Sequence, residues 1–256
     1  MAAFAVTSVK PVGVSALRRW YRSPAYPAWL LVVLVAWFAC WCWRPAHPQD
    51  FVLEHILTVV FITLFIVTRR TFPLSHLSYT LIFLFTAVHI VGAFYTYSLV
   101  PYDRWIATLV SWFGVEDFSF NEALGFTRNH YDRLVHFAFG LLLAYPAREV
   151  FLRIAEVKGF WGYYLPLDLV MSTSLMYELL EWAVMLIMAG DVGQSYLGTQ
   201  GDEWDAHKDM ALAAFGALLT MIVIALINAR WQRDFAREFN DSLRVKAPPP
   251  EISGVM

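Results

Sequence analysis

Six apolar runs, each close to the length needed to cross a lipid bilayer, constrain this chain of 256 residues more than any other feature. A hydrocarbon core about 30 Å thick takes about 20 helical residues to cross. The runs cover residues 27–43, 51–68, 77–95, 131–145, 165–188 and 210–227. With 59% hydrophobic and 16% charged residues, the composition is too apolar for a soluble domain of this size. The sequence therefore predicts an all-α membrane protein, a bundle of six transmembrane helices, without a nucleic-acid-binding basic surface.

The first run follows a basic amino-terminal segment, residues 1–26, which is the layout of either a signal sequence or a first membrane anchor. The run ends in the bulky residues 40–43 rather than in small residues suited to cleavage. Five more apolar runs follow it. We therefore interpret residues 27–43 as a membrane anchor.

The fourth run is short, but its helical periodicity continues past Pro146 to Ile154. This predicts a helix that emerges along the cytoplasmic surface, with Arg148 and Glu149 as surface residues.

Lysine and arginine gather on one side of the predicted spans, as expected for the cytoplasmic side. With the amino terminus inside, the cytoplasmic segments hold fourteen of the nineteen basic residues. They are Lys10, Arg18, Arg19, Arg22, Arg69, Arg70, Arg148, Arg153, Lys158, Arg230, Arg233, Arg237, Arg244 and Lys246. Both termini are therefore predicted to be cytoplasmic, with 27–228 as the membrane domain and 229–256 as a tail whose last residues, 247–256, are disordered.

The outer loop between spans three and four contains an apolar and aromatic stretch, residues 105–115, that is too short to cross the membrane. We predict that it forms an interfacial or re-entrant helix.

Acidic and histidine residues from five segments are predicted to meet near the extracytoplasmic side. A helical rise of about 1.5 Å per residue places each polar residue at a depth, and these residues fall in the outer half of the membrane. They are Glu54, His55, His89, Asp132, His136, Glu178, Glu181, Gln200, Asp202, Asp205, His207 and Asp209. Because a charged side chain deep in a bilayer costs about 2.5–3.5 kcal/mol on insertion scales, the two glutamates of span five must face the bundle interior.

Carboxylates with histidines are suitable ligands for Zn²⁺ or Mn²⁺, and carboxylates with waters for Mg²⁺ or Ca²⁺. The predicted metal ligands are His89, Asp132, His136, Glu178, Glu181, Asp202, Asp205 and Asp209. The predicted catalytic groups are Asp132, His136, Glu178 and Glu181. Such groups position and deprotonate a water, so metal-assisted hydrolysis or transfer is a coherent hypothesis.

Structural explanations compete with this hypothesis. Asp132 with His136, taken alone, suits a helix-entry cap and an interhelical hydrogen bond better than a site. Residues 200–209 would also suit a solvated loop leading into an acidic helix start. The acids Glu178 and Glu181 are harder to explain structurally, because they repel each other one turn apart in an apolar span.

Ala213 and Ala217, with Gly216 beside them, predict close helix packing rather than function.

Four stretches carry a family resemblance: "HIVGAFYTYSLVPYD", "YDRLVHFAFG", "ELLEW" and "LGTQGDEWDAHKDMALAAFGA". In order and spacing they resemble the YjdF-type family of uncharacterised bacterial inner-membrane proteins, over most of the chain. More loosely, they are similar to VanZ-like membrane proteins, although Ala213 and Ala214 stand where an asparagine is expected. The resemblance implies a bacterial inner-membrane protein. It implies no reaction, and for the VanZ-like group only an association with cell-envelope antibiotic resistance.

Three functions remain open at this stage. The first is a metal-dependent membrane hydrolase or transferase acting on a lipid or envelope-precursor substrate, with residues 105–115 as a lid over the site. The second is a proton-coupled small transporter that uses Glu178 and Glu181. The third is a scaffold for envelope partners, in which the polar residues only lock helices together. The metal, the substrate and the oligomeric state are not specified by the sequence.

Overall fold

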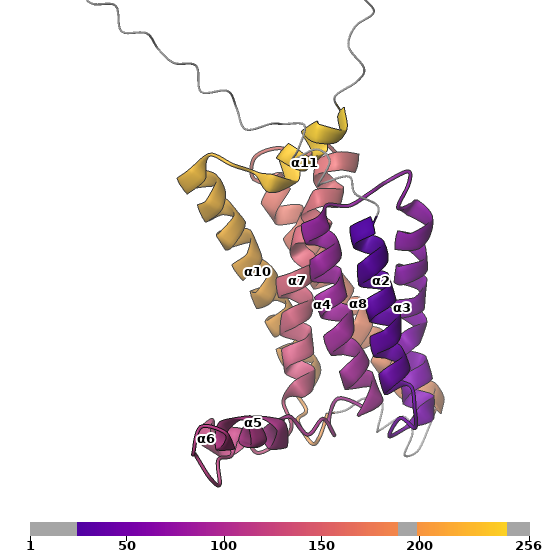
Figure 1. Cartoon of the computed structure of the whole chain (residues 1–256), viewed down its shortest axis with the longest axis vertical. Helices are drawn as coiled ribbons and strands as arrows, with labels where there is room; N and C mark the ends of the chain where they lie inside the picture. The colour runs from indigo at the N-terminus through magenta and orange to yellow at the C-terminus, as the bar shows by residue number, and fades with distance from the viewer. Residues whose placement is uncertain (1–24, 189–198, 245–256) are drawn as a thin grey trace, which may run out of the picture.

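The computed structural model describes residues 25–188 and 199–244, and all regular secondary structure in these ranges is helical. Six long helices in the described residues form a bundle (Figure 1). They are α2 (Ala25–Trp41), α3 (Pro48–Thr68), α4 (His76–Phe94), α7 (Tyr131–Ile154), α8 (Trp161–Met188) and α10 (Asp205–Trp231). The first residues of α2 and the short helix α11 (Phe235–Arg244) lie at the same, upper end of the bundle (Figure 1). The predictions for residues 1–24 and 247–256 lie outside the described residues.

Five of these helices, all but α2, are long and apolar enough to cross a membrane. The chain is therefore a multi-pass, all-helical membrane protein. The helix α2 is apolar but has 17 residues, or about 26 Å at 1.5 Å per residue. Several helices extend beyond the predicted apolar runs, because polar residues at their ends continue the helix; α10, for example, begins at Asp205 rather than at Met210.

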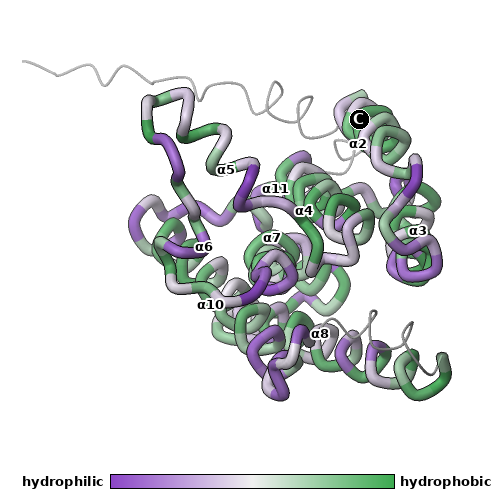
Figure 2. Tube along the Cα trace, turned by 90° about the horizontal axis from the view of Figure 1, so that it is seen from below, coloured by the Kyte–Doolittle hydropathy of each residue, from purple (hydrophilic) through white to green (hydrophobic). Residues whose placement is uncertain are grey.

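The helix α7 lies at the centre of the bundle. It packs against α4, α8, α10 and α11, whereas α2 and α3 pack mainly on α4 (Figure 2). As predicted, α7 continues through Pro146 to Ile154. This central position explains why α7 carries both a polar cluster at its lower end and buried charges at its upper end.

The crossing of α7 and α10 depends on two glycines. A Cβ atom on Gly140 would collide with the backbone of Ala213, and one on Gly216 with the backbone of Phe137. Ala213 and Ala217 are fully buried beside them. The predicted close helix packing is confirmed, and only small residues allow the two backbones to approach so closely.

Two buried charges close the upper end of the bundle, and here the prediction of surface residues was wrong. Arg148 and Glu149 are 1% and 0% exposed. Glu149 accepts hydrogen bonds from the Ser75 amide (2.9 Å), the Ser75 hydroxyl (2.7 Å) and the Ser78 hydroxyl (2.6 Å). Ser75 also caps α4 by accepting from the Ser78 amide. The carboxylate of α7 is thus tied to the start of α4.

Arg148 is buried because the segment after α10 folds back over it. Its two terminal nitrogens donate to both oxygens of Asp234, at 2.8 and 2.6 Å. This ion pair holds the pKa of Asp234 below its ordinary value, despite the opposing effect of burial. The helix α11 then packs on α7 with Ala236 and Phe239 fully buried. Part of the segment predicted as a cytoplasmic tail is therefore an ordered part of the fold.

The outer loop contains two short helices, α5 (Tyr102–Ser111) and α6 (Phe120–Ala123). The helix α5 begins three residues before the predicted stretch and ends earlier, before the left-handed Gly114. The Asp103 carboxylate joins the two helices, because it accepts from the Asn121 amide at 2.9 Å and from the Ser119 hydroxyl at 3.1 Å. Figure 1 shows α5 lying across the bundle axis beyond its lower end.

Candidate functional site

The lower end of the bundle brings acidic side chains of three helices together. Asp132 and His136 lie one turn apart near the start of α7, Glu178 and Glu181 lie in the second half of α8, and Asp209 lies in the second turn of α10. His136, Glu178, Glu181 and Asp209 are buried, and Asp132 is half-buried. The His136 Nε2 atom is 3.7 Å from Asp132 Oδ1 and 3.6 Å from Glu178 Oε1. The predicted convergence of these segments is therefore present in the structure.

Three of these residues have the donor set of a metal site. Asp132, His136 and Asp209 each offer one ligand atom, and the three atoms lie within 4.8 Å of one another. Atoms bound to one zinc ion lie at most about 4.4 Å apart, because each bond is about 2.0–2.2 Å long. The 4.8 Å bound is close to this limit, so the three side chains could hold one ion after small side-chain adjustments.

Two carboxylate oxygens in this cluster lack a partner. Within the described residues, Glu178 Oε1 and Asp209 Oδ1 are buried and accept no hydrogen bond. Leaving a buried polar group unsatisfied costs about 1–3 kcal/mol. Open oxygens beside a histidine are what a cation or a proton donor would satisfy.

The crossing of α7 and α10 fixes the two helices that carry the three candidate ligands. Gly140 follows His136 by one turn, and Ala213 follows Asp209 by one turn. Because Gly140 and Ala213 are the residues in close backbone contact, His136 and Asp209 start from positions that cannot shift apart easily. The small-residue packing thus serves the geometry of the cluster.

The structure does not bring Asp202 and Asp205 into this group, although the sequence predicted both as ligands. Asp205 pairs with Arg128, with Nη1–Oδ1 at 2.5 Å and Nη2–Oδ2 at 3.2 Å. Asp202 pairs with Arg133 and, at 2.6 Å, with Lys208 Nζ. The hydrogen bond from Lys208, with further ones from the Trp204 amide and Arg133, lowers the pKa of Asp202 to about 2. These carboxylates are engaged in an ion-pair network that we call the loop clamp.

Backbone and amide contacts extend the loop clamp. The Gln200 side chain accepts from the Asn129 amide and donates to the Asn129 carbonyl, both at 3.1 Å. Arg128 also donates to the Thr199 carbonyl at 2.8 Å. The segment before α10 is thereby fixed to the segment before α7, directly beside the candidate metal ligands. Burial and the nearby Arg133 and Arg128 lower the pKa of His130, at the start of α7, so this imidazole adds no third cation to the clamp at neutral pH.

The predicted ligand His89 belongs to a second, hydrogen-bonded group around Glu54. Its Nε2 atom bonds to the Thr58 hydroxyl at 2.8 Å and its Nδ1 atom to the Tyr97 hydroxyl at 2.7 Å. Glu54 Oε2 accepts from Tyr97 at 3.1 Å and from Tyr177 at 2.6 Å. Burial, and then the nearby Glu54, raise the pKa of Tyr97 well above its ordinary value, which keeps its hydroxyl a donor. Both ring nitrogens of His89 are therefore engaged.

Tyr177 connects the two groups. Its hydroxyl donates to Glu54, and its ring centroid is 5.9 Å from that of His136. The sequence predicts Glu54 in the outer half of the membrane but indicates no role for Tyr97 or Tyr177. The available signal was that Tyr177 directly precedes Glu178 in a helix whose acids must face inward.

A cavity between α8 and α10 leads to the cluster from the flank of the bundle. Its volume is about 670 Å³, and Glu178, Asp202 and Asp205 lie in its wall. On the α8 side of the cavity, the other lining residues are the apolar Leu175, Leu179 and Trp182. None of the lining residues belongs to α5, so the structure gives no support to a lid role for α5 at this cavity.

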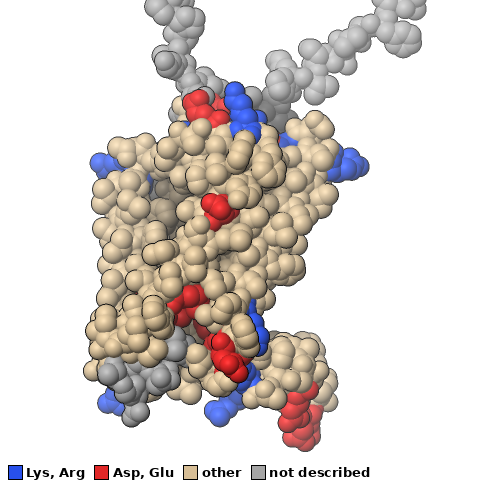
Figure 3. Space-filling view, turned by 180° about the vertical axis from the view of Figure 1, so that it is seen from behind, with Lys and Arg blue, Asp and Glu red and all other residues tan. Residues whose placement is uncertain are grey.

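The surface around the bundle is largely uncharged. Figure 3 shows isolated acidic patches on a flank that is otherwise free of charge, with basic side chains at both ends. Large apolar side chains, such as Val60, Leu186 and Leu226, are exposed on the long helices. Exposure of this kind over several long helices fits contact with lipid.

The fold therefore defines an integral, multi-pass membrane protein with a buried acidic cluster. A family model described as "Predicted membrane protein (DUF2238)" matches residues 26–230. The chain is 38% identical, over 192 residues, to the inner membrane protein YjdF of Escherichia coli (strain K12), covering 74% of this chain and 85% of that protein. The chain belongs to the DUF2238 family. The YjdF-type resemblance is confirmed, the VanZ-like resemblance has no support in these matches, and no solved structure matches significantly.

Proposed function

We propose that this protein is a metal-dependent hydrolase or transferase of the bacterial inner membrane that acts on a lipid or envelope-precursor substrate. The observation that carries the proposal is the Asp132, His136 and Asp209 group, whose ligand atoms lie within 4.8 Å. The open oxygens of Glu178 and Asp209 support it, because a structural cluster gains nothing from leaving them unsatisfied.

One nitrogen and two carboxylate oxygens favour Zn²⁺ or Mn²⁺, and added waters would suit Mg²⁺. Such an ion lowers the pKa of a bound water and polarises a carbonyl or phosphoryl oxygen. Glu178, 3.6 Å from His136, is placed to orient that water or take its proton. Glu181, one turn further along α8, is buried beside it.

The cavity between α8 and α10 supports an amphiphilic substrate. Its α8 side is apolar, and Glu178 lies in its wall. A lipid-linked group entering from the bilayer would keep its chain along α8 and bring its polar part to the cluster.

The proposed arrangement in the membrane has six spans, with both termini cytoplasmic and the cluster on the extracytoplasmic side. Fourteen of the nineteen basic residues then lie on the cytoplasmic side. The amphipathic helix α5 lies at the same end as the cluster, where it would rest in the interface rather than re-enter the membrane. The relative from Escherichia coli is named an inner membrane protein, which supports the same location.

The first test is metal analysis of the full-length protein purified in detergent without chelator. We expect close to one divalent ion per chain, a lower melting temperature after treatment with EDTA, and recovery on adding back Zn²⁺ or Mn²⁺. The variants Asp209→Asn and His136→Ala should lose the ion and the response to EDTA. Asp168→Asn, which removes an exposed acid of α8 outside the cluster, is the matched control.

A protein that holds no stoichiometric metal and melts at the same temperature with and without EDTA would contradict the proposal. Anomalous scattering at the metal edge gives an independent check, because the peak must lie between α7 and α10.

A proton-coupled transporter is the second candidate, favoured by the hydrogen-bonded chain Thr58–His89–Tyr97–Glu54. Such chains move protons in membrane proteins. Proton flux into liposomes that is abolished by Glu54→Gln, with no bound metal, would favour this candidate over the enzyme.

A further inference from the structure

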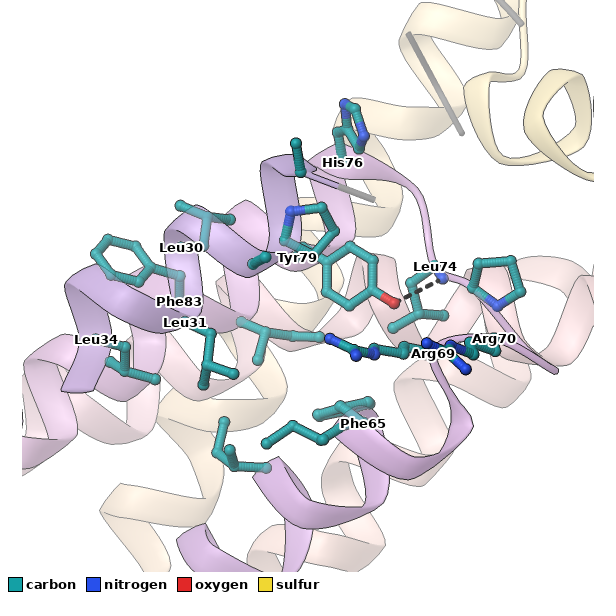
Figure 4. A pocket seen from close by; sticks show the side chains of 17 residues that line it. Leu30, Leu31, Leu34, Phe65, Arg69, Arg70, Leu74, His76, Tyr79 and Phe83 are labelled. Carbon is teal, nitrogen blue, oxygen red and sulfur yellow. Dashed lines mark hydrogen bonds between the residues drawn. The ribbon is translucent and has the colours of Figure 1, made fainter. Parts of the chain in front are cut away.

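A second cavity lies between α2, α3 and α4 (Figure 4). It is lined by the start of α2, the end of α3 and the start of α4, which lie at the upper end of the bundle, opposite to the acidic cluster (Figure 1). Its volume is about 490 Å³, within the range of about 300–1,000 Å³ that is usual for ligand pockets. Leu30, Leu31 and Leu34 of α2, Phe65 of α3 and Phe83 of α4 line its length. The cavity is thus a mainly apolar slot that runs along three helices.

Two arginines border this slot where α3 ends. Arg69 and Arg70 follow directly after the last residue of α3, Thr68, and line the cavity. Figure 4 shows both side chains next to each other, near Leu74 and Tyr79. Within residues 25–188 and 199–244, neither arginine forms an ion pair, and no acidic side chain lines the cavity. Two positive charges therefore adjoin an apolar slot without a negative partner.

Contacts between α2 and α4 shape the slot from the other side. The Tyr26 hydroxyl bonds to the Thr80 hydroxyl at 2.6 Å, and the Tyr26 ring packs on His76 with centroids 4.6 Å apart. Tyr79 accepts a hydrogen bond from the Leu74 amide at 3.2 Å. The Tyr26 contacts hold α2 against α4 beside the slot.

The chain itself does not supply a fitting occupant from its amino terminus. Residues 1–24 contain no aspartate or glutamate and four basic residues. Their charge would be repelled by Arg69 and Arg70. An anion with an apolar tail satisfies both parts of the slot, and arginines that directly follow a span lie at the depth of lipid headgroups.

We propose that this cavity binds an anionic phospholipid, with its phosphate at Arg69 and Arg70 and an acyl chain along Leu30, Leu31 and Phe65. The site is separate from the acidic cluster and does not depend on metal binding there. It holds α2 and α3, the two helices that pack mainly on α4, to the rest of the bundle.

The test measures lipid binding to the full-length, delipidated protein by native mass spectrometry and by lipid-dependent melting. The probes are phosphatidylglycerol, phosphatidylcholine with the same acyl chains, and inorganic phosphate. We expect phosphatidylglycerol to bind and raise the melting temperature more than phosphatidylcholine, and phosphate to have no effect. The double variant Arg69→Gln/Arg70→Gln should weaken phosphatidylglycerol binding about thirtyfold at low salt, since each basic residue contributes about fivefold.

Three variants make the result specific. Lys158→Gln/Arg230→Gln removes two exposed charges that form no ion pair with another described residue and do not line the cavity. They lie at the same end of the bundle, and this variant should bind as the unmodified protein does. Arg69→Lys/Arg70→Lys should recover most of the binding. Ala28→Phe fills the slot and should weaken lipid binding while both arginines remain.

Equal binding of the two lipids, or equal loss in both glutamine double variants, would overturn the proposal in favour of a non-specific charge effect. An effect of inorganic phosphate alone would show an anion site without the lipid. If Arg69→Gln/Arg70→Gln elutes as an aggregate, Ala28→Phe and the lysine variant decide the question.

Discussion

Both ends of the bundle contain carboxylates with little solvent exposure, but the two ends differ in how completely the carboxylate oxygens are hydrogen-bonded. At the upper end, both oxygens of Glu149 and both oxygens of Asp234 accept hydrogen bonds from serines or arginines. At the lower end, Glu178 and Asp209 each keep a buried oxygen without a partner among the described residues. A polar cluster that only joins helices is expected to satisfy its acceptors. The carboxylates of the upper end thus act as a structural lock, although Arg148 Nε and Asn228 Oδ1 there have no partner among the described residues. The open carboxylate oxygens of the lower end fit the proposed site.

The largest loss of folding stability is expected from a substitution at the upper end. Glu149→Ala leaves Arg153, the Ser75 amide and the Ser78 hydroxyl without their acceptor in the interior. Removing one member of such a buried network costs about 3–5 kcal/mol. Unfolding monitored in a mild detergent should show this loss, and Asp168→Ala, which removes an exposed acid of α8, should not. A loss below about 1 kcal/mol would remove the distinction between the two ends.

A smaller effect is expected in the loop clamp. Arg128→Met removes two hydrogen bonds to Asp205, which is buried, while Arg133 still reaches the same carboxylate at 3.2 Å. Hydrogen bonds to charged groups are worth about 1.5–3 kcal/mol, so we expect a loss in that range. Hydrogen exchange should become faster in residues 199–204. The control is Arg104→Met, an exposed arginine of α5 without an ion pair in the described residues; equal exchange in both variants would argue against the clamp.

Substitutions in the acidic cluster should leave the free energy of unfolding unchanged or raise it, in contrast to the two changes above. In metal-free protein, Glu178→Gln and Asp209→Asn each remove a carboxylate that lacks a full set of partners. We expect unfolding free energies that are unchanged or higher by up to about 1 kcal/mol, because functional sites are often costly to stability. Melting in EDTA measures this, with Asp168→Asn as the control. A large destabilisation would make the lower end a structural lock as well.

The smallest effect concerns pH. The pKa of Asp202 is lowered from its ordinary value of 3.8 to about 2 by its hydrogen bonds to Lys208, Trp204 and Arg133. A lowered carboxylate pKa stabilises the folded state above pH 4, and this contribution is lost as the pH falls towards 2. Asp202→Asn should therefore lower stability slightly at pH 7 and make much less difference at pH 2. An effect that is as large at pH 2 as at pH 7 would contradict the ionic origin of these contacts.

The sequence predicted the long helices and the meeting of Asp132, His136, Glu178 and Asp209, because both follow from apolar length and helical rise. It did not predict that Asp202 and Asp205 pair with Arg128 and Arg133. That pairing depends on two segments lying side by side, although the paired residues are 69–77 positions apart in the sequence.

The burial of Arg148 and Glu149 was missed for a similar reason. The helix α11 that helps to cover them is short, and its sequence is polar except for a few positions such as Ala236 and Phe239. A pattern of apolar runs detects membrane spans but does not detect a ten-residue amphipathic helix that packs on the end of one. The charges then look like surface residues until their partners are known.

The contact of Gly140 with Ala213 joins α7 and α10 into one rigid unit, which carries Asp132, His136 and Asp209. The helix α8 faces this unit across the cavity and contributes Glu178 and one wall of it. Any opening that admits a bulky molecule to the cluster must therefore come from a tilt of α8. For the proposed enzyme, a disulfide or cross-link that joins α8 to α10 is expected to stop turnover while leaving the three proposed ligands in place.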